Sequence, residues 1–230
     1  MIGFYDYTVV LTFISLLATV FGMTQAMDGH FRIAVVCLAF SGLCDTFDGK
    51  IARTKKNRTD HEKLYGIQLD SLCDVVCFGA FPAMICYLMG LSSVPGVLAI
   101  GYFCVCGVIR LAYFNVLETD RHYSDDHSEK VFHGLPITSI AVILPLMFVL
   151  GIFVPEGVFR VLLLGMLLVV GTLYILNFTL KKPKDWMIFC LIGVVACAVM
   201  AVLLFSEYRI SRRIVSEGPL IDEITEVCDE

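Results

Sequence analysis

Long apolar stretches recur along the whole chain and are separated by short polar segments. Each stretch is close to the roughly 20 residues that an α-helix needs to cross the hydrocarbon core of a membrane. The stretches lie at 8–27, 31–49, 66–89, 94–115, 135–155, 158–180 and 186–206. This pattern predicts an all-α fold, a polytopic transmembrane bundle of about 6–8 helices. We expect one membrane domain over residues 1–206 and a charged C-terminal tail over 207–230.

The basic residues gather on one side of this predicted bundle. Segments 50–63, 110–130 and 181–184 follow alternate spans, and together they hold twelve of the 17 lysines and arginines. Short loops rich in Lys and Arg stay in the cytoplasm, so we expect this side to be cytoplasmic. Seven crossings would leave the arginines at 209–213 on the opposite side, so the number of crossings stays open by one.

Composition narrows the class of protein. The chain is 58% hydrophobic and 17% charged, with a mean hydropathy of +0.82, which argues against an ordinary soluble enzyme. The formal net charge is −5, but six of the 22 acidic residues lie in 217–230, where there is no basic residue. The membrane domain is therefore almost neutral. It has no long basic tract with interleaved aromatic residues, so nucleic acid is not expected as a partner.

Four aspartates stand out because charges inside apolar spans are costly and usually functional. Asp45 and Asp48 close the second predicted span, and Asp70 and Asp74 open the third. Spacings of three and four residues place each pair on one helix face, so two facing helices would aim four carboxylates into one pocket. Such carboxylates repel one another unless cations lie between them. A set of oxygen ligands indicates Mg²⁺ or Mn²⁺, either as one ion or as a pair.

A network of salt bridges within the membrane is the alternative to a metal site, but the predicted spans hold too few basic residues to neutralise four aspartates.

The residues around the carboxylates read DTFDGKIAR over 45–53 and, twelve residues later, GIQLDSLCD over 66–74. This resembles the signature of the CDP-alcohol phosphotransferase family, D-x-x-D-G-x-x-A-R followed by G-x-x-x-D-x-x-x-D. The family commonly has a shorter connection. The difference is about one helical turn, so either the flanking helices keep their phase or the connection forms a larger loop.

Three further runs are similar to the phosphatidylserine synthase branch of this family. They are DSLCDVVCFGAFPA over 70–83, RLAYFNV over 110–116 and FHGLPIT over 132–138. Tyr113 stands where that branch often has arginine. The resemblance covers roughly residues 30–140 and implies the fold of the family, an all-α membrane bundle.

The resemblance also implies roles for individual residues. Asp45, Asp48 and Asp70 would be metal ligands for two ions, Mg²⁺ or Mn²⁺, and Asp74 would be the catalytic general base that also shares in metal binding. The residues implied to bind the CDP-lipid are Asp45, Gly49, Ala52, Arg53 and Gly66. Arg110 at the cytoplasmic end of the fourth span would contact the lipid phosphate or the acceptor, unless it serves as a positively charged anchor.

By this resemblance the chain is expected to be a transferase that moves the phosphatidyl group of CDP-diacylglycerol to the hydroxyl of L-serine. The products would be phosphatidylserine and CMP, formed by direct displacement. A homodimer is also implied, and the basic loops predict that the active site of this cell-membrane protein faces the cytoplasm. Inositol phosphate or glycerol phosphate remains an alternative acceptor. A cation-coupled transporter is a further alternative, although transporters tend to place their sites near the midplane of the membrane, often between repeats.

Overall fold

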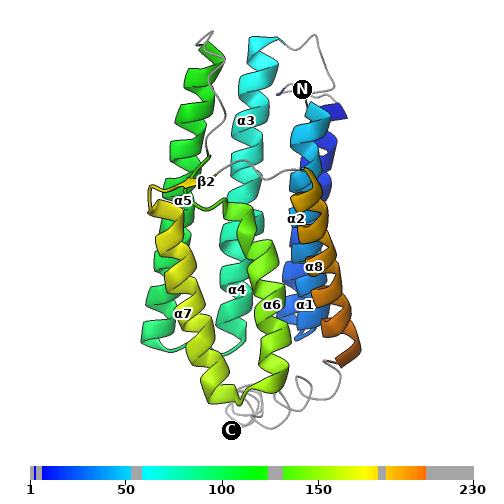
Figure 1. Ribbon diagram of the computed structural model, residues 1–230, viewed down its shortest axis with the longest axis vertical. Coiled ribbons are helices and arrows are strands. Elements are labelled where there is room, and N and C mark those ends of the chain that lie inside the picture. The colour runs from blue at the N-terminus through cyan, green and yellow to red at the C-terminus, as the bar shows by residue number, and fades with distance from the viewer. Residues whose placement is uncertain (1–2, 4–6, 53–58, 124–131, 181–184, 206–230) are drawn as a thin grey trace, which may run out of the picture.

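The computed structural model describes residues 3, 7–52, 59–123, 132–180 and 185–205, and helices make up nearly all of them. The helices are α1 (Val10–Met27), α2 (Phe31–Ala52), α3 (Asp60–Asp74), α4 (Phe81–Leu88), α5 (Val94–Tyr123), α6 (Ile140–Phe153), α7 (Glu156–Ile175) and α8 (Asp185–Phe205). Short 3₁₀ turns, η1 (Tyr7–Val9) and η3 (Ile137–Ser139), precede α1 and α6. The helices stand side by side as one bundle (Figure 1). The predicted all-α bundle is therefore confirmed.

One long rod carries half of the predicted site. A π-helical segment, η2 (Val75–Ala80), joins α3 directly to α4, so the helical rod runs without a break from Asp60 to Leu88. The sequence pattern predicts this span from residue 66, but the helix begins earlier because Thr59 and Glu62 form a capping box at its start. Residues 60–65 therefore lengthen the helix and shorten the loop after α2.

The rod is the most enclosed of the long apolar segments. Among the described residues, the segments long and apolar enough to cross a membrane are Val10–Met27, Asp60–Leu88, Val94–Asp120 and Glu156–Ile175. In the rod 61% of the apolar window is buried inside the protein, against 28–39% in the other three. Figure 1 places the rod between α5 and α2, and the rod packs against α1, α2 and α5. The rod that carries Asp70 and Asp74 is thus surrounded by other helices.

Two predicted spans do not meet that length and composition in the part of the chain that the structure describes. The span predicted at 31–49 forms α2, which carries four charged residues, Arg32, Asp45, Asp48 and Lys50. The span predicted at 135–155 appears as the shorter apolar stretch Ile137–Phe153, whereas the span predicted at 186–206 forms the 21-residue helix α8. The predicted tail at 207–230 lies outside the described residues.

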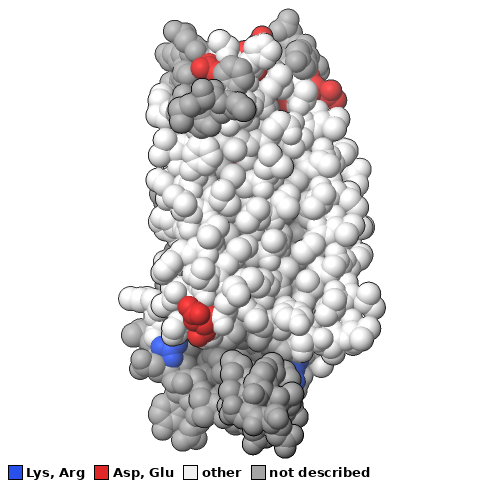
Figure 2. All heavy atoms as spheres, turned by 180° about the vertical axis from the view of Figure 1, so that it is seen from behind, with Lys and Arg blue, Asp and Glu red and all other residues white. Residues whose placement is uncertain are grey.

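The surface is consistent with a membrane environment. Figure 2 shows the acidic and basic side chains of the described residues near the two ends of the molecule, with a wide uncharged band between them. Large apolar side chains are exposed on the outer helices, for example Leu17 on α1, Leu98 on α5 and Val161 on α7. Because lipid rather than water is the solvent for such a band, these apolar side chains need no further cover.

A short sheet holds the segment before α6 in place. Strands β1 (Phe132–His133) and β2 (Thr179–Leu180) pair in antiparallel register. Gly134 follows with a φ of +73°, and a Cβ atom there would lie 3.0 Å from the carbonyl oxygen of Leu176. Only glycine fits this turn without strain. The turn brings the segment that precedes α6 against the end of α7.

Candidate active site

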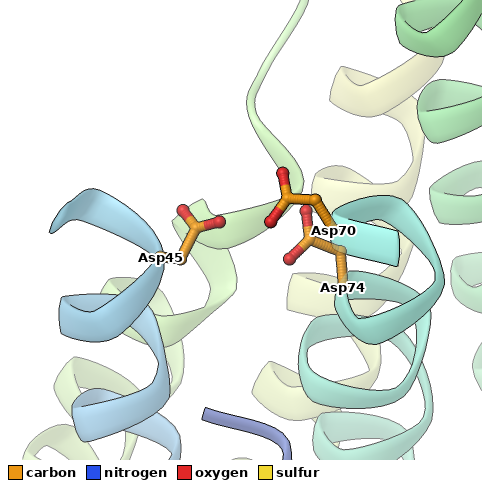
Figure 3. A group of neighbouring side chains, drawn as sticks. All are labelled: Asp45, Asp70 and Asp74. Atoms are coloured by element: carbon orange, nitrogen blue, oxygen red, sulfur yellow. The ribbon is translucent and has the colours of Figure 1, made fainter. Parts of the chain in front are cut away.

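Three carboxylates from two helices meet at one point. One oxygen from each of Asp45, Asp70 and Asp74 lies within 4.8 Å of the others. Figure 3 shows Asp45 on α2 pointing across to Asp70 and Asp74, which project from successive turns of α3. The four-residue spacing on α3 puts both side chains on one helix face. The predicted convergence of the two signature halves is therefore present in the fold.

Asp48 lies outside this group of three. Its side chain is buried, with 8% exposed, and the Thr12 hydroxyl of α1 donates a hydrogen bond to its Oδ2 at 3.3 Å. Asp48 remains close enough to interact electrostatically with Asp45 and Asp74. The fourth carboxylate thus belongs to the same charged region, and it accepts a hydrogen bond from a hydroxyl of α1.

Sequence reasoning missed Thr12, although a signal for it was present. Thr12, Ser15 and Thr19 recur at helical spacing within an otherwise apolar span and are all buried. Ser15 and Thr19 hydrogen-bond to Ser41 of α2. A polar stripe at that spacing predicts a helix face that meets polar groups on a neighbour.

The cluster is suited to a divalent cation. Three negative charges brought this close repel one another strongly at low dielectric, and a cation among them removes that cost. Two oxygen ligands of a single Mg²⁺ ion are at most about 4.2 Å apart, since each lies about 2.1 Å from the metal. The spacing of the three oxygen atoms is close to that limit. The three carboxylates are therefore close enough together to be candidate ligands of one hard cation.

The residues implied to bind the CDP-lipid are only partly visible. Gly66 lies one helical turn before Asp70 on α3 and is partly buried. Gly49 and Ala52 lie in the last turns of α2, which extends to Ala52, and their surroundings are outside the described residues. Arg53 is also outside the described residues. Of the implied lipid-binding set, Asp45, Gly49 and Ala52 thus lie on α2 and Gly66 lies on α3, the two helices that form the cluster.

Arg110 has a defined partner. It lies on α5 with 7% of its surface exposed, and its Nε donates to the carbonyl oxygen of Leu135 at 3.1 Å. This bond ties α5 to the segment before α6, and the Tyr174 hydroxyl of α7 donates to the Ile137 carbonyl beside it at 3.0 Å. At least one nitrogen of Arg110 therefore has a structural role, which is not a contact with the acceptor.

A second bond joins α5 to the signature helix. The Ser71 hydroxyl donates to Oδ1 of Asn115 at 2.6 Å, and Ser71 immediately follows Asp70. Ser71 and Asn115 come from two of the runs that resemble one branch of the family, and Arg110 and Leu135 come from two as well. The three runs therefore contact one another through α5.

Comparison with known proteins identifies the class. The sequence profile described as CDP-alcohol phosphatidyltransferase matches residues 7–173, well over half of the chain. The chain belongs to this family, and it is a multi-pass membrane protein.

Individual relatives carry more specific names. The CDP-diacylglycerol–serine O-phosphatidyltransferase of Saccharomyces cerevisiae is 39% identical over 129 residues, which cover 52% of this chain and 45% of the relative. The protein of the same name from Helicobacter pylori is 33% identical over 166 residues, covering 69% of this chain and 66% of the relative. An archaetidylserine synthase from Methanothermobacter thermautotrophicus is 33% identical over 129 residues, covering 56% of this chain and 51% of the relative. The chain spans about half the length of most of the curated relatives it matches.

Proposed function

We propose that this protein transfers the phosphatidyl group of CDP-diacylglycerol to the hydroxyl of L-serine and releases CMP. The observation that carries the proposal is the convergence of Asp45, Asp70 and Asp74 from the two halves of the family signature. The names of the relatives in yeast and Helicobacter support serine as the acceptor. A cation-coupled transporter is not proposed, because the chain belongs to a family of phosphatidyltransferases.

In the proposed mechanism the carboxylates hold divalent ions, Mg²⁺ or Mn²⁺, and two ions fit the number of acidic groups. When bound, the ions neutralise the pyrophosphate and the developing charge on the leaving CMP. Asp45 and Asp70 supply ligand oxygens from facing helices, and Thr12 orients Asp48 as a further ligand.

Asp74 accepts the proton of the serine hydroxyl as its oxygen attacks the phosphorus next to diacylglycerol. The new bond joins the serine oxygen to that phosphorus, and the bond from the phosphorus to the CMP oxygen breaks. No covalent enzyme intermediate is required, because the attacking and leaving oxygens lie on opposite sides of the phosphorus.

The nucleotide side of the site is proposed from the family signature. Gly49, Ala52 and Gly66 are small, so the cytidine and its phosphates can approach the backbone closely. Arg53 offers a permanent charge and a planar set of donors for a phosphate. Arg110 would complete the site from α5 only through nitrogens other than the Nε that binds Leu135.

The reaction is proposed to take place at the cytoplasmic surface. The C-terminal end of α2, the N-terminal end of α3 and the C-terminal end of α5 lie at one end of the bundle (Figure 1). Lys50 in the last turn of α2, Lys63 in the first turns of α3 and Arg121 in the last turn of α5 belong to this end, and basic segments of this kind remain in the cytoplasm. A homodimer is proposed from the family resemblance, and light scattering of the purified protein in detergent would test it.

The activity is tested with purified protein in detergent, CDP-diacylglycerol, labelled L-serine, and Mn²⁺ or Mg²⁺. We expect metal-dependent release of CMP together with labelled phosphatidylserine. Release of CMP with inositol phosphate or glycerol phosphate, but not with serine, would assign a different acceptor. If none of these acceptors supports release, the proposed transferase activity is wrong.

A further inference from the structure

A buried polar contact joins α1, α2 and the rod close to the carboxylate cluster. Ser15 of α1, Ser41 of α2 and Cys77 of η2 meet there, and they are 4%, 0% and 1% exposed. Polar groups that are shielded from water in this way are costly unless they are hydrogen-bonded. The three residues therefore rely on one another as hydrogen-bond partners.

Ser15 bonds to both of the other helices in this contact. Its hydroxyl donates to the carbonyl oxygen of Ser41 at 3.4 Å, and the Ser41 hydroxyl donates to the Ser15 carbonyl at 3.1 Å. The Ser15 hydroxyl oxygen also lies 3.7 Å from the sulfur of Cys77. A hydroxyl has one proton to donate. Because Ser15 donates its proton to Ser41, the thiol of Cys77 is the donor to Ser15.

Both partners of Ser15 lie about one turn from a carboxylate. Ser41 precedes Asp45 by four residues on α2, so their side chains share one face of that helix. Cys77 follows Asp74 by three residues, in the first turn of η2. Ser15 therefore bonds to the two carboxylate-bearing helices directly beside the cluster.

Helix α1 lies against both of these helices. Among the described residues, α2 and α3 have little direct contact with each other, whereas α1 packs against α2, α3 and η2. Figure 3 shows Asp45 on one side of the cluster and Asp70 and Asp74 on the other. A Mg²⁺ ion demands ligands at nearly fixed distances, so ligands from separate helices bind it only while the helices keep their spacing. A residue that ties α1 to both helices fixes that spacing.

We propose that Ser15 is a positioning residue for the metal site. Through Ser41 and Cys77 it holds α2 and the rod at the spacing that the metal ligands require. The proposal rests on the proposed function, because that function assigns the divalent ions to the carboxylates. In this role Ser15 touches neither an ion nor the substrate. It resembles the groups behind metal ligands, whose loss commonly lowers metal affinity about 10–100-fold.

The first test is the affinity for Mn²⁺, which requires no turnover. Free Mn²⁺ is measured by electron paramagnetic resonance in a titration of the full-length protein in detergent. We expect Ser15→Ala to raise the Kd for Mn²⁺ roughly tenfold. Thr24→Val is the control and should keep the wild-type Kd, because the Thr24 hydroxyl is exposed and donates to the Phe21 carbonyl of its own helix. An unchanged Kd in folded Ser15→Ala protein would overturn the proposal, even if its melting temperature were lower.

A second pair of variants isolates the link to the rod. Cys77→Ala removes the thiol and keeps both bonds between Ser15 and Ser41, whereas Cys77→Ser keeps a donor at the same position. We expect the Kd for Mn²⁺ to rise in Cys77→Ala and to return towards the wild-type value in Cys77→Ser. Equal Kd values in these two variants would contradict the link. This pair also decides the question if Ser15→Ala does not fold.

Initial rates provide a signature that a merely structural role would not produce. At a low Mn²⁺ concentration the kcat of Ser15→Ala should fall while the KM for L-serine stays unchanged, and about tenfold more Mn²⁺ should restore kcat. A loss of kcat that Mn²⁺ does not restore would overturn the role in metal positioning.

Failure of this inference can be told from failure of the proposed function. If the wild-type protein releases no CMP with any acceptor, the transferase proposal fails, but the Mn²⁺ affinities still test the role of Ser15. If CMP is released and the Kd for Mn²⁺ does not depend on Ser15, only the positioning role is wrong.

Discussion

Asp45 reaches the cluster from α2, whereas Asp70 and Asp74 reach it from α3, so their spacing depends on how the two helices are rotated. A rotation of α3 would move both of its carboxylates away from Asp45. The bond from Ser71 to Asn115 opposes such a rotation, because it ties the residue after Asp70 to α5. At the scale of residues, the site depends on hydrogen bonds that do not themselves involve its carboxylates.

Substitution of the carboxylates should separate binding from turnover. Asp74→Asn removes the proposed proton acceptor and keeps the shape, so we expect loss of CMP release with most CDP-lipid binding retained. Asp45→Asn removes a proposed metal ligand, so metal-dependent nucleotide binding should weaken. Equilibrium binding of labelled CDP-diacylglycerol, with and without Mn²⁺, measures the difference. Equal loss of binding in both variants would argue against Asp74 as a dedicated base.

The bond between Ser71 and Asn115 can be measured by a double-mutant cycle. Ser71→Ala and Asn115→Ala should each lower the free energy of unfolding by about 1 kcal/mol and reduce kcat more than they change the KM for serine. The double variant should lose less than the sum of the two single losses, because the same bond is removed in each. Thermal unfolding in detergent and initial rates provide the data. Strict additivity would mean that the two side chains are not coupled.

At this scale the sequence predicts chemistry better than it predicts contacts. Helical periodicity predicts that Asp70 and Asp74 share one face of α3, whereas their meeting with Asp45 also required α2 and α3 to face each other. The bond of Arg110 to the Leu135 carbonyl could not be predicted in the same way. A backbone acceptor carries no side-chain signal, and it becomes available only when the segment before α6 has folded against α7.

Among the helices, α1 and α2 pack unusually closely. Ser15, Thr19 and Ser41 form hydrogen bonds across the contact, and Gly22 lies further along the same face of α1. A Cβ atom at Gly22 would lie 2.5 Å from Cζ of Phe81 and 2.7 Å from Cβ of Cys37. Helices in membranes rely on such small residues and polar pairs, because no hydrophobic effect drives them together in lipid. This contact also positions Thr12 beside Asp48.

Two glycine substitutions test the importance of that contact. Gly22→Ala should destabilise the protein by about 1–3 kcal/mol through overpacking. Gly165→Ala on α7 is the control, since no atom lies within 4 Å of its added methyl group. Alanine is favoured over glycine in a helix by about 1 kcal/mol, so Gly165→Ala should be neutral or stabilising. Melting temperatures in the same detergent compare them, and a Gly22→Ala variant as stable as the wild type would contradict the close packing.

The sequence carries a signal for the start of α3 but none for the π-helical segment that follows it. The start of α3 at Asp60 has a readable signal in Thr59 and Glu62, a capping pair, but hydropathy alone places the start later. The π-helical segment Val75–Ala80 has no such signal, since apolar residues occur in both helix types. It follows directly after Asp74, so the phase of α4 relative to the carboxylates could not be worked out from the sequence.

For the whole molecule, metal binding and stability should be linked. The three clustered carboxylates repel one another without a cation, so binding of Mn²⁺ should favour the folded state. Binding contributes about 2.7 kcal/mol when the free metal is at 100 times its Kd. We expect the melting temperature to rise with Mn²⁺ and to fall again after chelation.

Asp45→Asn serves as the control for this linkage, because it removes one ligand of the cluster. The rise in melting temperature with Mn²⁺ should be much smaller in this variant, and NaCl at matched ionic strength should not reproduce it. A rise of equal size in the variant and the wild type would place the stabilising ion elsewhere.

The enclosure of the Asp60–Leu88 rod has a consequence for how the protein responds to its membrane. The exposed apolar surfaces of α1, α5 and α7 form the boundary with lipid, whereas most of the apolar part of the rod is covered by protein. When the bilayer is thinner or thicker than the apolar band, helices adjust mainly by tilting. The outer helices, which contact the lipid, are therefore the first to tilt. The spacing between Asp70 and Asp74 is set within a single covered helix and is thereby insulated from changes in bilayer thickness.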